Sequence, residues 1–182
     1  MFMKILIGLM IVVAGAVAGI AAVVALQPST YSISRSTTMA AAPTDAFAQV
    51  NDFHNWEAWS PWAKLDPASK VAFEGAASGK GAVFKWSGND EVGEGSMTIV
   101  DSQAPKQIKI KLAFVRPFES TADTVFDFAP AGAGTTVTWT MSGENNFLSK
   151  AFCLVMGGMD KVVGPDFERG LAQMRAVAEK KK

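Results

Sequence analysis

The chain has 182 residues, of which 49% are hydrophobic and 19% charged, and its 17 basic and 17 acidic side chains give a formal net charge of +0. Because the basic residues are scattered apart from Lys180-Lys181-Lys182, the sequence lacks the basic surface typical of nucleic-acid-binding proteins. The single cysteine, Cys153, excludes an internal disulfide and a metal cluster held by several thiolates. About 150 residues follow the N-terminal segment, enough for one domain with its own hydrophobic core.

The N-terminal segment is strongly apolar. Lys4 is the only charged residue before Arg35, and an unbroken apolar run covers residues 5–26. Since a helix rises about 1.5 Å per residue, about 20 apolar residues cross the hydrocarbon core of a bilayer. The sequence therefore predicts a transmembrane helix, with residues 1–28 as a membrane anchor and residues 29–182 as a separate domain.

A cleaved signal peptide is the alternative, because Val23-Val24-Ala25 supplies small residues at a plausible cleavage site. The apolar run is longer than the roughly 7 to 15 residues of a typical signal-peptide core, which favours the anchor. Lys4 precedes the run and Arg35 is the first charge after it, so the positive-inside rule favours a cytoplasmic N-terminus. We expect a single-pass membrane protein whose domain lies on the extracytoplasmic side.

Hydrophobic periodicity predicts the elements of the domain in chain order. A strand over residues 31–39 is followed by a helix from residue 42 and by a short aromatic-rich helical piece over residues 51–62. Turns rich in glycine and proline then separate six strands, expected at residues 71–74, 82–87, 92–100, 107–115, 119–128 and 135–142.

A long helix over residues 147–179 ends the chain. We expect it to be interrupted or bent near Gly157-Gly158 and Gly164-Pro165, since proline removes a backbone donor and glycine weakens a helix. Short turns allow all the strands to pair in chain order. The fold class predicted is therefore α+β, with an antiparallel sheet curled around the terminal helix.

The strands place large apolar side chains on one face. In the strand that begins at Gln107, for example, Ile108 and Ile110 alternate with Lys109 and Lys111. Such a face, rich in aromatic residues and methionine, suits either a solid core or a pocket for an apolar ligand, and the residues alone leave both open. The residues expected to line such a pocket are Trp59, Trp62, Phe84, Trp86, Met97, Leu112, Phe114, Phe126, Trp139, Met156 and Met159.

Candidate catalytic groups are few. His54 follows Asp52 by two positions and could act as a general base, but a position on the surface or at a helix cap is the favoured interpretation, because no motif places a second group. Cys153 lies in an apolar run, which favours a buried structural thiol. The acidic residues at the turn 90–94 have no histidine or cysteine beside them, so solvated carboxylates are expected rather than a metal site. We predict no catalytic residue, metal or cofactor, and enzymatic activity stays open.

Four motifs accompany this order of elements: Asn55-Trp56-x-x-Trp59-Ser60-Pro61-Trp62, Gly95-Ser96-Met97-Thr98-Ile99, Gly134-Thr135-Thr136-Val137-Thr138-Trp139-Thr140 and Gly164-Pro165-Asp166-Phe167-Glu168-x-Gly170-Leu171. Over residues 31–179 the chain resembles the SRPBCC superfamily, which includes the START-like and Bet v 1-like helix-grip proteins. Its bacterial branch is labelled polyketide cyclase/dehydrase and lipid transport. The resemblance implies a seven-stranded sheet that grips a long C-terminal helix, with a hydrophobic cavity between them for lipids, polyketides or similar molecules.

The residues and the resemblance together indicate a membrane-anchored protein that binds a hydrophobic or amphipathic small molecule, with the terminal helix as a lid near Gly157-Gly158. One alternative is an aromatase/cyclase-type enzyme that uses the same cavity, for which Thr124 is a polar candidate. Another is an envelope interaction module with a filled core and the segment 56–62 as its contact surface. The expected partners are the apolar ligand or lipid and the membrane, and the oligomeric state stays open.

Overall fold

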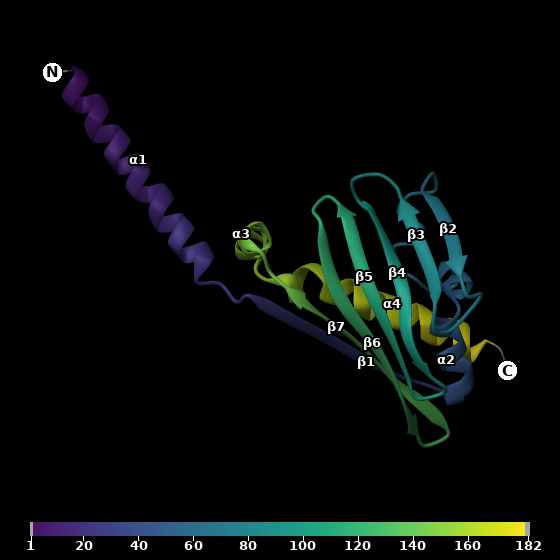
Figure 1. The fold of residues 1–182 in the computed structure, drawn as a ribbon. Coiled ribbons are helices and arrows are strands. Elements are labelled where there is room, and N and C mark those ends of the chain that lie inside the picture. Colours follow the sequence, from purple (N-terminus) through teal and green to yellow (C-terminus); the bar gives the residue numbers. More distant parts are fainter. Residues whose placement is uncertain (1, 181–182) are drawn as a thin grey trace.

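The computed structural model describes residues 2–180, which form an N-terminal helix, a twisted antiparallel sheet and a C-terminal helical region (Figure 1). The elements are α1 (Phe2–Ala25), β1 (Thr30–Met39), α2 (Pro43–Asn51), the 3-10 helix η1 (Phe53–Ala58), β2 (Lys70–Gly75), β3 (Ala82–Ser87), β4 (Glu94–Gln103), β5 (Gln107–Arg116), β6 (Ser120–Ala131), β7 (Gly134–Glu144), α3 (Phe147–Met156) and α4 (Met159–Glu179). The predicted strands and helices are all present, in the predicted order.

The sheet has seven antiparallel strands in the order β1-β7-β6-β5-β4-β3-β2. Strands β2 to β7 pair in chain order, as predicted. The expectation that every strand pairs with its successor was wrong for β1, which pairs with β7 over its whole length. The reason is that α2 and η1 lie between β1 and β2 in the chain and carry it from one edge of the sheet to the other.

Hydroxyl pairs on the outer face support the β1–β7 pairing. The side-chain oxygens of Ser36 and Thr138 are 2.8 Å apart, and those of Thr38 and Thr136 are 2.9 Å apart. Cross-strand hydroxyl pairs of this kind contribute to sheet stability. The alternation of small polar residues along both strands therefore belongs to the face of the sheet that α4 does not cover.

The inner face of the sheet carries the predicted apolar side chains. Ile108 and Ile110 of β5 are buried while Lys109 and Lys111 are exposed, so the strand alternates as its sequence predicts. The hydrophobic core lies between this face, α2, η1 and the second half of α4. Burial on one face only is what a half-covered antiparallel sheet requires.

Helix α1 projects away from the sheet (Figure 1) and almost all of its side chains are exposed. Among the described residues it is the one helix long and apolar enough to cross a membrane, over Ile5–Ala25. A signal sequence near an N-terminus has the same length and composition. The structure is therefore consistent with both the anchor and the signal peptide.

The C-terminal helical region breaks at one of the two predicted places. Gly157 and Gly158 have backbone φ angles of +80° and +105° and separate α3 from α4. Of the interruption or bend predicted at Gly164-Pro165, the interruption is absent, because α4 continues through both residues. Gly164 instead permits a close approach: a Cβ there would lie 2.3 Å from Nη2 of Arg35 on β1.

Gly170 plays the same role further along α4. A Cβ at this position would lie 3.0 Å from Pro61 Cδ and 3.0 Å from Trp139 Cζ3. Both neighbouring atoms belong to rigid rings, so neither can move away from an added Cβ by rotation about a single side-chain bond. The two glycines, Gly164 and Gly170, thus let the backbone of α4 lie close to the sheet and to the turn after η1.

We predict that Gly170→Ala lowers the free energy of unfolding. In an open helix the change would stabilise the protein by about 1 kcal/mol, but overpacking costs about 1–3 kcal/mol and here exceeds that gain. Urea unfolding of the full chain in detergent, followed by tryptophan fluorescence, measures the difference. Ala172→Gly at an exposed position of the same helix calibrates the helix-propensity contribution. A higher unfolding free energy for Gly170→Ala would contradict the proposed packing.

Candidate functional site

Six aromatic side chains fill the space beneath the middle of α4. The η1 segment and the turn after it supply three tryptophans, β6 and β7 supply two rings, and α4 supplies one: these are Trp56, Trp59, Trp62, Phe126, Trp139 and Phe167. The rings of Trp139 and Phe167 stack with their centroids 3.9 Å apart and their planes 9° apart. Because Trp59 and Phe126 are fully buried, this aromatic cluster is a packed core.

Hydrogen bonds hold the tryptophans of the aromatic cluster in place. Trp56 Nε1 donates to the Val50 carbonyl at 3.1 Å, and Trp59 Nε1 donates to the Gln49 carbonyl at 3.0 Å. Both acceptors lie at the C-terminal end of α2, whose last carbonyls have no partner within the helix. The Trp-rich segment therefore packs as a wedge that joins α2 to the sheet.

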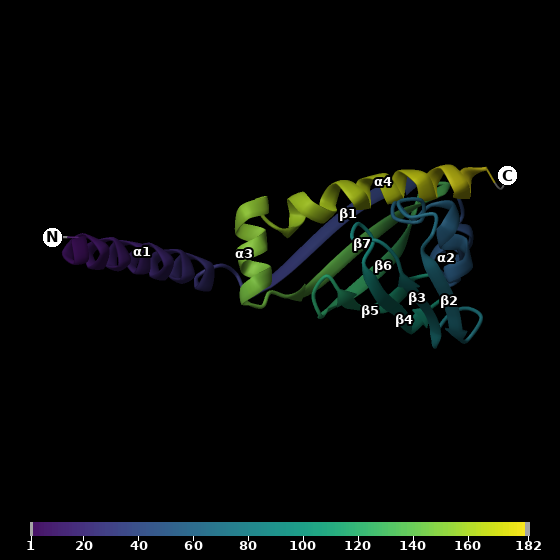
Figure 2. The same cartoon turned by 90° about the horizontal axis from the view of Figure 1, so that it is seen from above.

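A second group of apolar side chains lies on the inner face of β3, β4 and β5 and is only half-buried. We call it the β3–β5 apolar face, and its residues are Phe84, Trp86, Met97, Leu112 and Phe114. Helix α4 packs mainly along β1, and Figure 2 shows it over β1 and β7, with β3 to β5 further from the helix. The curvature of the sheet thus leaves this face incompletely covered.

Trp86 is the fixed centre of the β3–β5 apolar face. Its Nε1 donates to the Val92 carbonyl at 2.9 Å, and its ring lies over Gly95, where a Cβ would be 2.6 Å from the ring. The ring stacks on Phe84 at 6.0 Å and meets the edge of Phe114 at 5.8 Å. Hydrogen bonding and ring packing therefore hold this aromatic surface in place, which suits contact with an apolar molecule.

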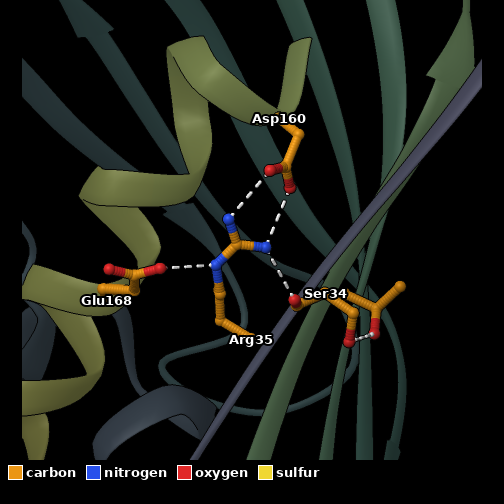
Figure 3. Close-up of polar contacts among 5 residues, drawn as sticks. Ser34, Arg35, Asp160 and Glu168 are labelled. Carbon is orange, nitrogen blue, oxygen red and sulfur yellow. Dashed lines mark hydrogen bonds and ion pairs between the residues drawn. The ribbon is translucent and has the colours of Figure 1, made fainter. Parts of the chain in front are cut away.

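Arg35 ties the first half of α4 to β1 (Figure 3). Its Nη1 and Nη2 donate to the two carboxylate oxygens of Asp160 at 2.8 Å and 3.0 Å, and its Nε donates to Glu168 at 2.7 Å. We call these three residues the Arg35 latch. The hydrogen bonds raise the pKa of the Arg35 guanidinium, and the bond from Arg35 lowers the pKa of the Asp160 carboxyl.

The sequence did not reveal the Arg35 latch. The sequence pattern identifies Arg35 only as the first charged residue after the apolar run. Its position between Ile33 and Met39 in an alternating strand nevertheless places it on the inner face of the sheet. A charged residue at an inward position was the available signal. Its partner could not be identified, because Asp160 lies 125 positions away in the chain.

Few polar side chains are buried in the interior. Gln49 and Thr135 donate to backbone carbonyls of Asp45 and Ala41. Thr124, predicted as an inward polar residue, is indeed buried on the inner face, with 5% of its surface exposed. The buried indole nitrogen of Trp139 has no hydrogen-bond partner.

The residues weighed for catalysis lie elsewhere. His54 is exposed, its Nδ1 is 2.7 Å from Asp52 Oδ1, and its ring stacks on Phe73 at 4.0 Å. Cys153 was expected to be buried, but it is half-buried because α3 buries no residue at all. Burial still raises the pKa of its thiol, which disfavours the reactive thiolate. Glu94, at the turn where solvated carboxylates were expected, is partly exposed and also forms an ion pair with Arg116.

Two surface hollows lie at the β2 end of the sheet. One, of about 280 Å³, is lined by Phe53, His54, Phe73 and the turn after β2. The other, of about 360 Å³, lies among β2, β3, β4 and β5, and its lining includes Lys85, Trp86 and Val115. Neither of these hollows lies beneath α4.

The eleven residues expected to line a pocket fall into three groups. Trp59, Phe126 and Trp139 are buried in the aromatic cluster, and Trp62 is half-buried within it. Five residues form the β3–β5 apolar face, and Met159 of α4 is half-buried against the core. Met156, at the end of α3, is half-exposed and does not join the others.

The family model for polyketide cyclase / dehydrase and lipid transport proteins matches residues 30–179. The chain belongs to this family. The match covers the sheet, the aromatic cluster, the Arg35 latch and all of α4, so the described site lies within the family's own domain. No curated protein shows significant similarity to the chain.

Solved structures share the fold of this family member at low sequence identity. A protein from Chromobacterium violaceum is 14% identical with a TM-score of 0.56, over 84% of this chain and 99% of that one. A protein from Mesorhizobium loti is 17% identical with a TM-score of 0.59, over 84% and 99%. The di-domain ARO/CYC StfQ from the steffimycin biosynthetic pathway is 12% identical with a TM-score of 0.60, and the match spans 84% of this chain and 52% of StfQ. These similarities establish the fold alone.

For this polyketide cyclase / dehydrase and lipid transport family member, we predict that the Arg35–Asp160 pair depends on pH. Because the pKa of Asp160 is lower in the folded chain than its usual 3.8, the pair stabilises the fold above that pH and loses its contribution as the pH falls through the folded-state pKa. A double-mutant cycle with Arg35→Met and Asp160→Asn, read by urea unfolding, should give a coupling energy at pH 7 that disappears near pH 2.

The pair formed by Arg169 and Asp166, both within α4, is the matched control, because it does not cross to the sheet. An Arg35–Asp160 coupling energy that is absent at pH 7, or that persists unchanged at pH 2, would contradict the role of the latch.

Proposed function

We propose that this protein is a membrane-anchored binding protein for a hydrophobic or amphipathic small molecule, held between the β3–β5 apolar face and the first half of α4. The observation that carries the proposal is the half-buried state of five large apolar side chains on the concave side of a sheet. Covering apolar surface stabilises a complex by about 25 cal/mol per Å². A ligand that completes the burial of this face thus gains about 2.5 kcal/mol for each roughly 100 Å² covered.

The aromatic cluster is not part of this binding site in the proposal. Trp59, Phe126 and Trp139 already pack against one another and against Phe167. A ligand there would have to displace stacked rings and would leave their contacts unmade. Of the eleven predicted residues, the proposal keeps the five of the β3–β5 apolar face together with Met159.

The first half of α4 acts as the lid. Gly157 and Gly158 precede it, and their positive φ angles make this junction a place where the chain changes direction without a helical constraint. The lid is closed by the Arg35 latch, whose carboxylates are exposed. Exposed ion pairs are weak and exchange readily with water, so the Arg35–Asp160 pair can open at the first turn of α4, while Glu168 stays beside the stacked Phe167.

An aromatase/cyclase activity is the second candidate, favoured by the family's description and by nothing specific in the geometry. Such a reaction needs polar groups that converge on the ligand. The side chains of Gln49 and Thr135 already donate hydrogen bonds to backbone carbonyls. Of the other inward polar groups in the described chain, Arg35 is paired with Asp160 and Glu168, and Thr124 and the Trp139 indole do not form an acid–base pair with each other. Binding therefore accounts for the site with fewer assumptions.

The membrane location rests on α1. Ile5–Ala25 is long and apolar enough to span a bilayer, and the charge distribution of the sequence favours an extracytoplasmic domain. A binding domain tethered to the bilayer meets apolar molecules at the surface where they are concentrated. The anchor and the β3–β5 apolar face thus both support the binding of an apolar molecule at the membrane.

Photocrosslinking tests the proposal. The full chain in lipid nanodiscs is exposed to a fatty acid with a diazirine on its acyl chain, with and without excess oleic acid, and labelled peptides are mapped by mass spectrometry. We expect competed labelling on β3, β4 and β5, reduced several-fold by Met97→Gln, because the amide places unpaired polar atoms against the acyl chain. Val100→Thr, on the exposed outer side of the same strand, is the matched control.

Labelling of α1 by the membrane-dissolved probe serves as the internal positive control. Labelling confined to α1 and insensitive to oleic acid would overturn the binding proposal. Equal competed labelling of the Met97→Gln and Val100→Thr variants would place the ligand away from the β3–β5 apolar face.

A further inference from the structure

Helix α3 is an apolar helix that buries none of its own residues. Apart from Lys150, its ten residues carry no charge, and its exposed side chains include several large apolar ones. They are Phe147, Leu148, Phe152, Leu154, Val155 and Met156, with Val155 82% exposed. A helix that is hydrophobic on all sides is ordinarily covered by protein or by lipid. In the described chain its main contacts are with α1 and α4, and its large apolar side chains stay exposed.

The length of α3 limits what can cover it. Ten residues make a helix of about 15 Å, about half the thickness of the hydrocarbon core. The helix is therefore too short to span a bilayer. An apolar helix of this length fits instead within the interfacial layer of one leaflet, where its side chains reach the acyl chains from the surface.

The contact between α3 and the end of α1 determines which leaflet α3 would enter. Lys150 Nζ donates to the carbonyl of Ala25, the last residue of α1, at 3.2 Å, and Val24 is buried at the same junction. Figures 1 and 2 both show α3 beside the end of α1. The 24 residues of α1 extend about 36 Å, slightly more than the hydrocarbon core of about 30 Å. When α1 crosses the bilayer, Ala25 and α3 lie together at its surface.

The charges around α3 agree with this depth. The single cation, Lys150, lies at the junction with α1, where a long side chain reaches the headgroup region. The nearest charged residues in the sequence, Glu144 at the end of β7 and Asp160 and Lys161 of α4, lie outside α3. No carboxylate of α3 would need to be removed from water.

We propose that α3 lies in the interfacial layer of the leaflet from which α1 emerges, as a second membrane contact of this chain. The inference rests on the proposed anchoring by α1 and deepens the proposed function. With α3 in the lipid, Gly157, Gly158 and the first turn of α4 lie at the bilayer surface. The lid then opens toward lipid, so the ligand class is an acyl-chain lipid taken from the bilayer rather than a solute from water.

Depth-dependent fluorescence quenching tests the inference on the full chain in nanodiscs. In a Cys153→Ser background, an NBD label is placed on Val155→Cys or on Leu148→Cys. These two positions are about two helical turns apart and lie on the same side of α3. Matched labels are placed on Val12→Cys in the middle of α1 and on Glu91→Cys in an exposed turn. Phospholipids with a doxyl group at carbon 5 or at carbon 12 act as shallow and deep quenchers.

We expect both α3 labels to shift to the blue by about 10 nm or more relative to Glu91→Cys, and to be quenched more by the shallow doxyl lipid than by the deep one. The Val12→Cys label should be quenched more by the deep lipid. Emission of the α3 labels that matches Glu91→Cys, with Val12→Cys still quenched, would overturn the inference and leave the anchor in place. An unquenched Val12→Cys label would overturn the anchor and the inference together.

Discussion

The stacking of Trp139 on Phe167 fixes α4 on the sheet, and the other features of the domain depend on it. The centroid separation of 3.9 Å places the middle of the helix against Trp139 of β7, and Gly170 provides the space for that approach. The first turn of α4 has no equivalent stack, and its Asp160 is held by an exposed ion pair with Arg35. Glu168, the other carboxylate of the latch, directly follows Phe167. The helix is thus fixed at its middle by stacked rings and at its first turn by an exposed ion pair, which is the arrangement that the proposed lid requires.

Periodicity in the sequence predicts the strands and their inner faces, because a strand alternates with a period of two whatever it pairs with. It does not predict the partner of β1, since pairing with β7 depends on the path of the chain through α2 and η1. Nor does it predict that α4 continues through Gly164-Pro165, where both glycine and proline disfavour helix locally. Tertiary contacts override local propensity at these positions.

In the candidate site, too, the sequence predicts the orientation of the side chains but not their tertiary packing. Inward orientation of Phe84, Met97 and Leu112 follows from their strand positions, whereas their incomplete burial follows from where α4 crosses the sheet. Trp139 shares the inward orientation but lies under the helix and is buried. Sequence alone therefore identifies the apolar interior and the family motifs, and the structure divides that interior into a packed aromatic cluster and a half-covered face.

Native mass spectrometry tests the central claim, that the β3–β5 apolar face holds an apolar molecule, most directly. The full chain is purified from its own host in mild detergent, released in the gas phase, and its bound molecules are extracted and identified. The account predicts one co-purifying apolar molecule at near-stoichiometric ratio, lost from Met97→Gln and retained by Val100→Thr. A chain that is empty, or equally loaded in both variants, would contradict it.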